Sequence, residues 1–234
     1  MRYNVLQMSN KVSSVAAIAK SYGELTDNQQ GSYFLIKKNN PSETTRRSPL
    51  EQKVLSKGEA YAYLHGAMHD ASLNKVRRIR FGQKYPEWLN TIKGLLQFVG
   101  ENSWMYKEGK NRDFYILETV CKNLDFTFNP VTLTINREKV AYIRGFFDAE
   151  GGIPRTSKEF YIQLVQKNFR KMETLKKMLG DLGIYCGKIH NPSKRADPNY
   201  WRIFISRNSH KDFASIVGSW HPIKAKIFSE RMMI

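Results

Sequence analysis

The feature that most constrains this chain is an internal repeat covering residues 58–234. Gln83 is followed 17 positions later by Gly100, and Gln166 is followed 17 positions later by Gly183. Both glutamines precede a lysine at the end of a strand-like segment, and both glycines close a segment with helical periodicity. One offset of 83 residues relates both pairs, so the sequence predicts two copies of one αββαββ-like unit.

Each copy opens with an apolar, helix-like run that carries one internal glycine, Gly66 in the first copy and Gly145 in the second. These glycines are offset by 79 residues, and the four-residue difference from 83 fits in the loop that follows. A glycine inside a helix costs about 1 kcal/mol relative to alanine. The cost is offset where another backbone must approach closely, so we expect the two helices to pack together through their glycines.

Both runs end in acidic residues. In the stretch Tyr142–Pro154 the second run reaches Asp148 and Glu150 and then a glycine pair, and the first run reaches Asp70. The helix dipole disfavours a carboxylate at a helix C-terminus, and two carboxylates that lie close together repel each other. We therefore expect Asp70 and Glu150 to meet around divalent metal ions, which carboxylates hold in phosphodiester-hydrolysing sites.

The two acids do not align perfectly, because Glu150 lies five residues after Gly145 whereas Asp70 lies four after Gly66. One residue corresponds to about 100° of rotation and 1.5 Å of rise along an α-helix. We expect the first helix to end early or unwind so that Asp70 can serve as the second metal ligand. The alternatives are a site with one carboxylate, which would nick one strand much faster than the other, and no cleavage at all.

The sequence YIRGFFDAEGG, from Tyr142 to Gly152, resembles the LAGLIDADG motif of homing endonucleases, with Glu150 at the acidic metal-binding position. With HGAMHDAS as an imperfect first copy, residues 58–234 resemble a monomeric, double-motif LAGLIDADG endonuclease. The resemblance implies an α+β fold of two αββαββα halves, related by a pseudo-two-fold axis, with saddle-shaped antiparallel sheets and the motif helices at the centre. The expected divisions are an N-terminal extension or accessory arm (1–57), a first half (58–136) and a second half (137–234).

The same resemblance implies a site-specific endonuclease that hydrolyses double-stranded DNA with Mg²⁺, its sheets lying along the major groove. It adds Gln83, Gln166 and either Lys224 or Lys226 to the two acids as catalytic residues; the first half offers no equivalent lysine-rich segment. Strand residues and neighbouring loop residues are the candidates for contacts with DNA. These are Arg77, Arg78, Arg80, Lys84, Arg155, Lys158, Gln163, Lys167, Lys194, Arg195 and Arg202.

Composition agrees with a polyanionic partner. The net charge is +17, and it divides into +5 for residues 1–57, +2 for 58–136 and +10 for 137–234. A broadly basic folded domain favours nucleic acid as the partner. Two cysteines cannot build a disulfide framework, and we expect both to be buried thiols. With no long apolar run and no signal-peptide core, the sequence favours an intracellular setting, in the cytoplasm or an organelle matrix.

Periodicity and turn residues predict the remaining elements. A capping box at Ser56 and Glu59 opens the first motif helix. Further helices are expected over 87–99 and 170–182, and strands over 75–84, 104–106, 114–120, 160–167 and 200–206, with another strand near Tyr185. In the N-terminal extension, 12–22 has helical spacing and 39–47 reads as a polar linker.

Two other functions compete with cleavage of DNA. The imperfect first motif favours a relative that has lost cleavage and acts as an intron RNA maturase or a DNA-binding protein. His65 and His69 have the spacing of metal ligands on one helix face, but no third ligand is evident, and the repeat explains this helix better. No phosphate-binding loop, dinucleotide fingerprint or zinc-finger spacing is present.

Overall fold

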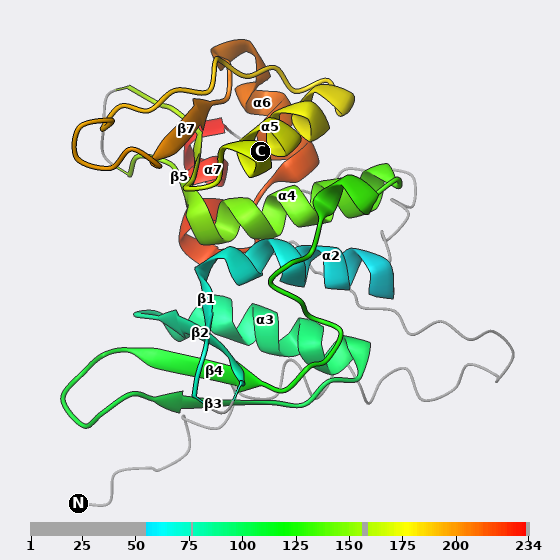
Figure 1. Cartoon of the computed structure of the whole chain (residues 1–234), viewed down its shortest axis with the longest axis vertical. Helices are drawn as coiled ribbons and strands as arrows, with labels where there is room; N and C mark the ends of the chain where they lie inside the picture. Colours follow the sequence, from blue (N-terminus) through cyan, green and yellow to red (C-terminus); the bar gives the residue numbers. More distant parts are fainter. Residues whose placement is uncertain (1–54, 76, 156–158, 233–234) are drawn as a thin grey trace, which may run out of the picture. The chain divides into compact units, whose positions relative to one another are not determined.

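The computed structural model describes residues 55–75, 77–155 and 159–232, and its arrangement is shown in Figure 1. The first half contains α2 (Lys57–Ala67), the 3₁₀ helix η1 (Met68–Asp70), β1 (Ala71–Leu73), β2 (Ile79–Gln83), α3 (Pro86–Val99), β3 (Ser103–Lys107), β4 (Tyr115–Thr119) and the 3₁₀ helix η2 (Pro130–Thr132). The second half contains α4 (Asn136–Glu150), β5 (Gly151–Gly152), β6 (Gln163–Gln166), α5 (Phe169–Asp181), β7 (Trp201–Phe204), the 3₁₀ helix η3 (Arg207–Ser209), α6 (His210–Asp212), the π-helical turn η4 (Phe213–Val217) and α7 (Pro222–Met232). The α+β class with antiparallel sheets is confirmed.

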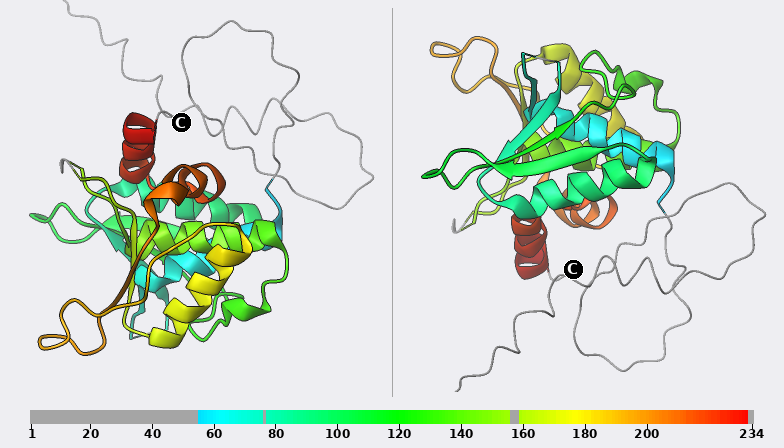
Figure 2. Two further views of the ribbon diagram at one scale, coloured as in Figure 1. Left: turned by 90° about the horizontal axis from the view of Figure 1, so that it is seen from above. Right: turned by 90° about the horizontal axis from the view of Figure 1, so that it is seen from below.

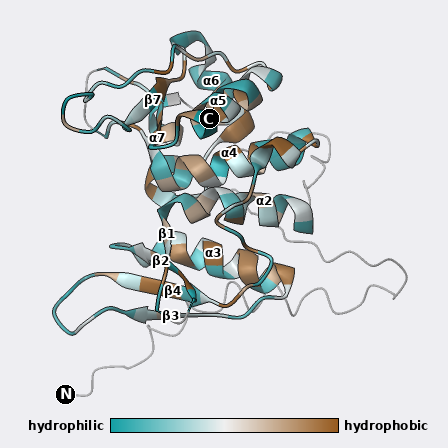
Figure 3. Cartoon of the chain, viewed as in Figure 1, coloured by the Kyte–Doolittle hydropathy of each residue, from teal (hydrophilic) through white to brown (hydrophobic). Residues whose placement is uncertain are grey.

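The first half forms a four-stranded antiparallel sheet in the order β1-β2-β4-β3, with α3 packed on one face. Because side chains alternate along a strand, the paired residues Phe81 and Leu117 share one face of the sheet. They are fully buried in the same core cluster as Trp88 and Ile92 of α3. Figure 3 shows the apolar stripe of α3. Gly100 then ends this helix in a left-handed conformation (φ 92°), as its position after the periodic segment predicts.

The second half forms a three-stranded antiparallel sheet in the order β5-β6-β7, with α5 against β6 and β7. The prediction of a regular strand near Tyr185 is wrong, because only isolated bridges form there. Its backbone follows β7 through hydrogen bonds from the Gly187 amide to the Phe204 carbonyl (2.9 Å) and between His190 and Arg202 (2.9 and 3.0 Å). Between the bridges Cys186–Ile205 and His190–Arg202, residues 187–189 lie opposite only 203–204. The extra residue makes a bulge that interrupts the ladder.

The remaining sequence predictions differ mainly at element ends. β1 and β5 were not predicted, since two or three residues leave no periodic signal. The predicted strands 75–84, 160–167 and 200–206 shorten to β2, β6 and β7. The helix and linker predicted within 1–54 lie outside the described residues. None of the helices in the described ranges is both long and apolar enough to cross a bilayer.

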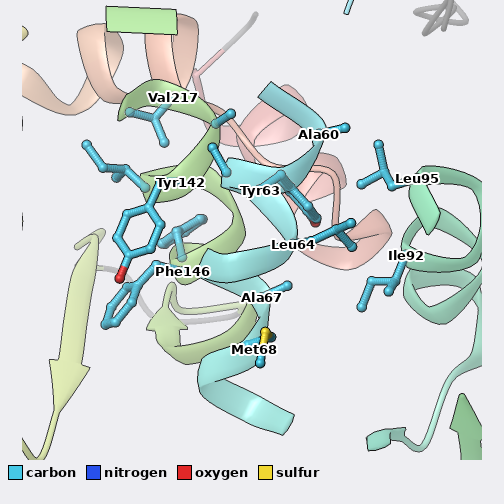
Figure 4. Close-up of a cluster of buried hydrophobic side chains, with 14 of the residues drawn as sticks. Ala60, Tyr63, Leu64, Ala67, Met68, Ile92, Leu95, Tyr142, Phe146 and Val217 are labelled. Atoms are coloured by element: carbon cyan, nitrogen blue, oxygen red, sulfur yellow. The ribbon is translucent and has the colours of Figure 1, made fainter. Parts of the chain in front are cut away.

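The motif helices α2 and α4 make the most extensive contact between described elements, and they lie side by side in both orientations of Figure 2. A Cβ added to Gly145 would collide with the carbonyl oxygen of Tyr63 and lie 3.0 Å from the Ala67 nitrogen. A Cβ added to Gly66 would collide with the carbonyl of Tyr142. The glycines therefore allow backbone-to-backbone contact, with large side chains closing the core around it, as Figure 4 shows.

Candidate active site

Sheet register places Asp70 and Glu150 at equivalent positions. β1 follows Asp70 directly and pairs Ala71 with Phe81, while β5 follows Glu150 directly and pairs Gly151 with Leu164. Phe81 and Leu164 differ by the 83-residue offset of the repeat, so the residues before the two short strands correspond. Counting five residues from Gly66, as from Gly145 to Glu150, would give Ala71, whereas the strand pairing gives Asp70.

The first motif has one residue fewer between its glycine and its acid than the second, and a change of helix type compensates for this difference. α2 ends at Ala67, and η1 continues as a 3₁₀ helix from Met68 to Asp70, whereas α4 remains α-helical to Glu150. A 3₁₀ residue rises about 2.0 Å and an α residue about 1.5 Å, so both acids lie about 7.5 Å along the axis from their glycines. The tighter turn thus carries Asp70 as far in four residues as α4 carries Glu150 in five.

The two carboxylates lie close enough to influence each other. Partial burial raises the pKa of Glu150, and the negative charge of Asp70 raises it further. Desolvation also raises the pKa of Asp70, opposed by the hydrogen bond from Gln83, although the residue as a whole remains exposed. The positive charge of Lys224 opposes both shifts. The site is therefore a pair of acids whose raised pKa values are opposed by Lys224 and, at Glu150, also by Lys167.

Lys224, from α7, closes the C-terminal end of α4. Its Nζ donates hydrogen bonds to the carbonyl oxygens of Phe147 (2.6 Å) and Asp148 (2.8 Å). The Phe147 carbonyl also accepts the Gly151 amide, whereas the Asp148 carbonyl lies in the last turn, where the helix itself supplies no amide partner. Burial lowers the pKa of Lys224 to about 8, opposed by the charges of Asp148, Asp70 and Glu150. The ammonium group thus compensates the helix dipole at the end that carries Glu150.

Lys226 does not lie at this site. Its side chain is 76% exposed and pairs with Glu230 at 3.7 Å along α7. Two residues along an α-helix correspond to about 200° of rotation, so Lys226 points away from the side on which Lys224 reaches α4. Of the two lysines suggested by the sequence, the structure brings Lys224 alone to the carboxylates.

The two glutamines predicted at strand ends have different partners. Gln83 donates from Nε2 to Oδ2 of Asp70 at 2.7 Å, so it orients this carboxylate. Gln166 instead contacts Nδ1 of His69 at 2.9 Å, and His69 Nε2 lies 3.0 Å from the hydroxyl of Tyr142. The histidine therefore crosses from the first half and holds the second glutamine.

Sequence spacing indicated only a metal-ligand role for His69, and its contact with Gln166 was not predicted. Burial lowers the pKa of His69 to about 3, with a smaller effect from Lys171, so the imidazole is neutral near pH 7. A neutral ring with its proton on Nε2 donates to Tyr142 and accepts from Gln166. The signal that could have found this role is the position of His69 directly before Asp70.

Asp148, the other acid of the second motif, is buried and structural. It accepts hydrogen bonds from the Tyr63 hydroxyl (2.6 Å), the Ser219 hydroxyl and the Trp220 amide (2.9 Å). The Tyr63 hydroxyl in turn accepts from Trp88 Nε1 at 2.8 Å. This network ties the segment before α7 to both motif helices and thereby positions Lys224.

The predicted DNA-contacting residues occupy two neighbourhoods. In Figures 1 and 2 the β3–β4 hairpin and the turn before β7 project on the side where α2 and α4 end. Arg80 on β2 and Gln163 on β6 have equivalent positions on the sheet faces turned away from α3 and α5. Arg77, Lys84, Arg155, Lys167, Lys194 and Arg195 are exposed, while Arg78 and Arg202 are half-buried. Lys158 lies outside the described residues.

The donor set fits a hard divalent cation only in part. Across residues 55–75, 77–155 and 159–232, no group of three or more His, Cys, Asp or Glu could hold a metal ion. Asp70 and Glu150 offer two carboxylates, and Mg²⁺ is commonly bound by one or two carboxylates together with substrate phosphates and water. The residues present therefore fit a cation that is completed by a bound phosphate.

Comparisons with known proteins agree with this architecture. A family model described as a LAGLIDADG-like domain matches residues 137–218. The homing endonuclease I-ApeI of Aeropyrum pernix is 25% identical over 201 residues, covering 74% of this chain and 87% of that protein. The structure of I-DmoI in complex with DNA and Mn matches with a TM-score of 0.56 and 22% identity, covering 70% of this chain and 98% of that one.

A third similarity extends the fold beyond proteins described as endonucleases. The N-terminal LAGLIDADG domain of DUF199/WhiA matches with a TM-score of 0.55 and 17% identity, covering 70% of this chain and 82% of that one. Shared fold alone therefore does not assign an activity. Residues 137–218 thus match a LAGLIDADG-like domain, and the chain is similar to I-ApeI and has the fold of I-DmoI.

Proposed function

We propose that this protein is a site-specific endonuclease that hydrolyses phosphodiester bonds in a long double-stranded DNA target. The observation that carries the proposal is the equivalent placement of Asp70 and Glu150 at the ends of two packed helices, beside Lys224. The similarity to a homing endonuclease supports the same reaction class. We propose further that halves 58–136 and 137–234 act together in one monomer, inside the cell.

Asp70 and Glu150 would hold the divalent cations. The similar I-DmoI structures contain Mn, Mg or Ca, and we propose Mg²⁺ as the ion used here. A bound cation would polarise the scissile phosphate and lower the pKa of a coordinated water. The mutual repulsion of the two acids provides a physical reason for a cation to bind between them.

The chain's own residues would orient and neutralise the reacting groups. Gln83 fixes the carboxylate of Asp70 through its 2.7 Å hydrogen bond. Lys224 carries a positive charge below a pH of about 8, and this charge would offset the negative charge that develops on the phosphate. Gln166 is held by His69, so the two halves would present different polar groups to the two DNA strands.

The direct test measures cleavage of each separately labelled strand by wild type, Glu150→Gln and Asp70→Asn, with and without Mg²⁺. We expect Glu150→Gln to abolish cleavage and retain specific DNA binding, because the substitution preserves shape and removes the charge. We expect Asp70→Asn to slow the two strands unequally. Glu173→Gln, an exposed residue of α5, serves as the charge-matched control.

A binding protein without cleavage is the second candidate, acting on DNA or on intron RNA. The imperfect first motif HGAMHDAS favours it, and so does the similarity to the WhiA domain, whose description names no nuclease. Specific binding of duplex DNA by the wild type with no cleavage under Mg²⁺ or Mn²⁺ would select this candidate. Cutting by Glu150→Gln at the wild-type rate would instead show that the site is assigned wrongly.

A further inference from the structure

The outward face of the first sheet contains a buried carboxylate. Glu118 of β4 has a side chain that is 6% exposed, and it accepts hydrogen bonds from Tyr106 (3.0 Å), Asn74 (3.3 Å) and Arg78 (3.4 Å). Its Oε1 also lies 3.3 Å from Nε of Arg80. A buried acid with two arginines is costly to desolvate, so its place on this surface calls for a functional explanation.

Strand register brings these groups together in one row. Arg80 of β2 is paired with Glu118, and Glu118 is paired with Trp104 of β3. Phe81 and Leu117, the next residues along their strands, point the opposite way and are buried under α3, so this row lies on the face turned away from that helix. The guanidinium carbon of Arg78 lies 5.0 Å from the centre of the Trp104 ring.

Arg80 is held between two acids. Its Nη2 donates to Oε1 of Glu108 at 3.1 Å, while its Nε lies 3.3 Å from Glu118. A guanidinium has five N–H donors, so the group can keep these contacts and still offer donors to a ligand. The side chain lines a hollow of about 240 Å³ that also contains Asp70 and Glu108, so it lies close to the candidate active site.

In the second half, the row of residues equivalent to Arg80, Glu118 and Trp104 contains different side chains. Gln163 stands where the first half has Arg80, because both precede their strand-end glutamine by three residues, and it pairs with Phe204 rather than with an acid. Arg202 lies against the rings of Tyr200 and Phe204 and donates to the Tyr200 hydroxyl at 3.2 Å. The second half also carries +10 of the net charge, compared with +2 for the first.

We propose that Glu118 is a specificity-determining positioning residue, which holds Arg78 and Arg80 as guanine-reading groups in the major groove. A fixed arginine fork matches O6 and N7 of guanine, and the acids remove the freedom that would let the same arginine bind any phosphate. The first half thereby reads sequence, while the more basic second half contributes more of the sequence-independent attraction. This inference rests on the proposed function, because it requires duplex DNA on these sheet faces.

The test selects duplexes from a library with randomised base pairs, in Ca²⁺, using wild type and Glu118→Gln. We expect the wild type to prefer guanine at specific positions, and Glu118→Gln to weaken that preference by about tenfold or more. Its affinity for random duplex should stay equal or rise, since one negative charge is gone. A role in folding alone would lower both affinities together, so the opposite signs separate the two explanations.

Two further variants keep the test decisive. Arg80→Lys retains the charge and removes the planar fork, so it should weaken the guanine preference at the position that Arg80 reads, with an unchanged salt dependence, even if Glu118→Gln folds poorly. Glu173→Gln removes one acid from the exposed face of α5 and should select the wild-type sequences. Wild-type selection by both Arg80→Lys and a folded Glu118→Gln would overturn the inference. A wild type that binds no duplex would overturn the proposed function itself.

Discussion

At the scale of single residues, Lys224 combines a structural contact with a position beside the candidate acids. Its ammonium group contacts two carbonyl oxygens at the end of α4 and lies in the field of three carboxylates. The surrounding acids and carbonyls make a buried lysine tolerable, because each offsets part of its desolvation. The same acids keep its charge at the place where a phosphate would accumulate negative charge.

We expect Lys224→Met to lower the cleavage rate constant by about 10²-fold, which is typical of removing one group that stabilises charge in a transition state. Lys226→Met is the matched control, two positions along the same helix and 76% exposed, and it should cut at the wild-type rate. Single-turnover cleavage at saturating protein, with thermal melting of both variants, provides the measurement. Equal decreases in the two variants would contradict the assignment of Lys224.

His69 should make the fold sensitive to acid. Its folded pKa is about 3 and its unfolded pKa is about 6.5, so the unfolded chain binds more protons between these values. Stability must then fall as the pH falls through this window, by up to about 1.4 kcal/mol per pH unit from this residue. Urea unfolding at pH 7, 6 and 5 should show a smaller decline for His69→Gln than for wild type, and parallel declines would refute the contribution.

At the scale of elements, the α2–α4 pair and the 3₁₀ helix η1 determine where the acids lie. Close packing through Gly66 and Gly145 brings the two helix ends together, and η1 supplies the missing rise on one side. The elements that follow, β1 and β5, then pair in the same register with β2 and β6. These features act through the backbone, whereas Gln83 orients the Asp70 side chain.

Gly145→Ala should destabilise the protein by about 1–3 kcal/mol or more, because the added methyl group meets backbone atoms of α2 that cannot rotate away. Gly180→Ala in α5 is the matched control, since no other atom lies within 4 Å of its added Cβ. That change should stabilise the protein by up to about 1 kcal/mol through helix propensity. Melting temperatures that shift in the same direction for both variants would contradict the close helix contact.

At the scale of the whole molecule, charge is divided unequally between the halves. The second half carries +10 and the first half +2, and arginines of the first half are engaged by Glu118 and Glu108. Counterion release makes binding of a basic protein to duplex DNA fall steeply with salt. The second half should therefore contribute more than the first to the salt dependence of DNA binding.

The double variant Lys194→Gln/Arg195→Gln, in the exposed turn before β7, should reduce the slope of log K against log salt by about 0.9 for each phosphate that it no longer neutralises. Lys177→Gln/Lys211→Gln makes the same change of charge on exposed positions of α5 and α6 and should leave the slope closer to wild type. Titrations of random duplex between low and moderate salt measure both slopes. A larger effect from the α5 and α6 variant would indicate that DNA binds the face formed by these helices, and would contradict binding at the turn before β7.

The duplication, the helix pair and the approach of Asp70 to Glu150 could be predicted from the order of the residues. They follow from patterns that can be read directly from the sequence, such as the 83-residue offset, the glycine inside each apolar run and the capping box at Ser56. The α5 and α3 helices were predicted to within one residue because amphipathic periodicity and their terminal glycines are strong local signals.

The partners of individual side chains, in contrast, depend on how distant elements pack. Gln83 and Gln166 look alike in sequence, yet one contacts Asp70 and the other contacts His69, because the histidine reaches across from the opposite helix. Lys224 and Lys226 are chemically identical, and only the packing of α7 against α4 separates them. Sequence spacing specifies which residues share an element, whereas contacts between distant elements depend on how packed backbones orient each side chain.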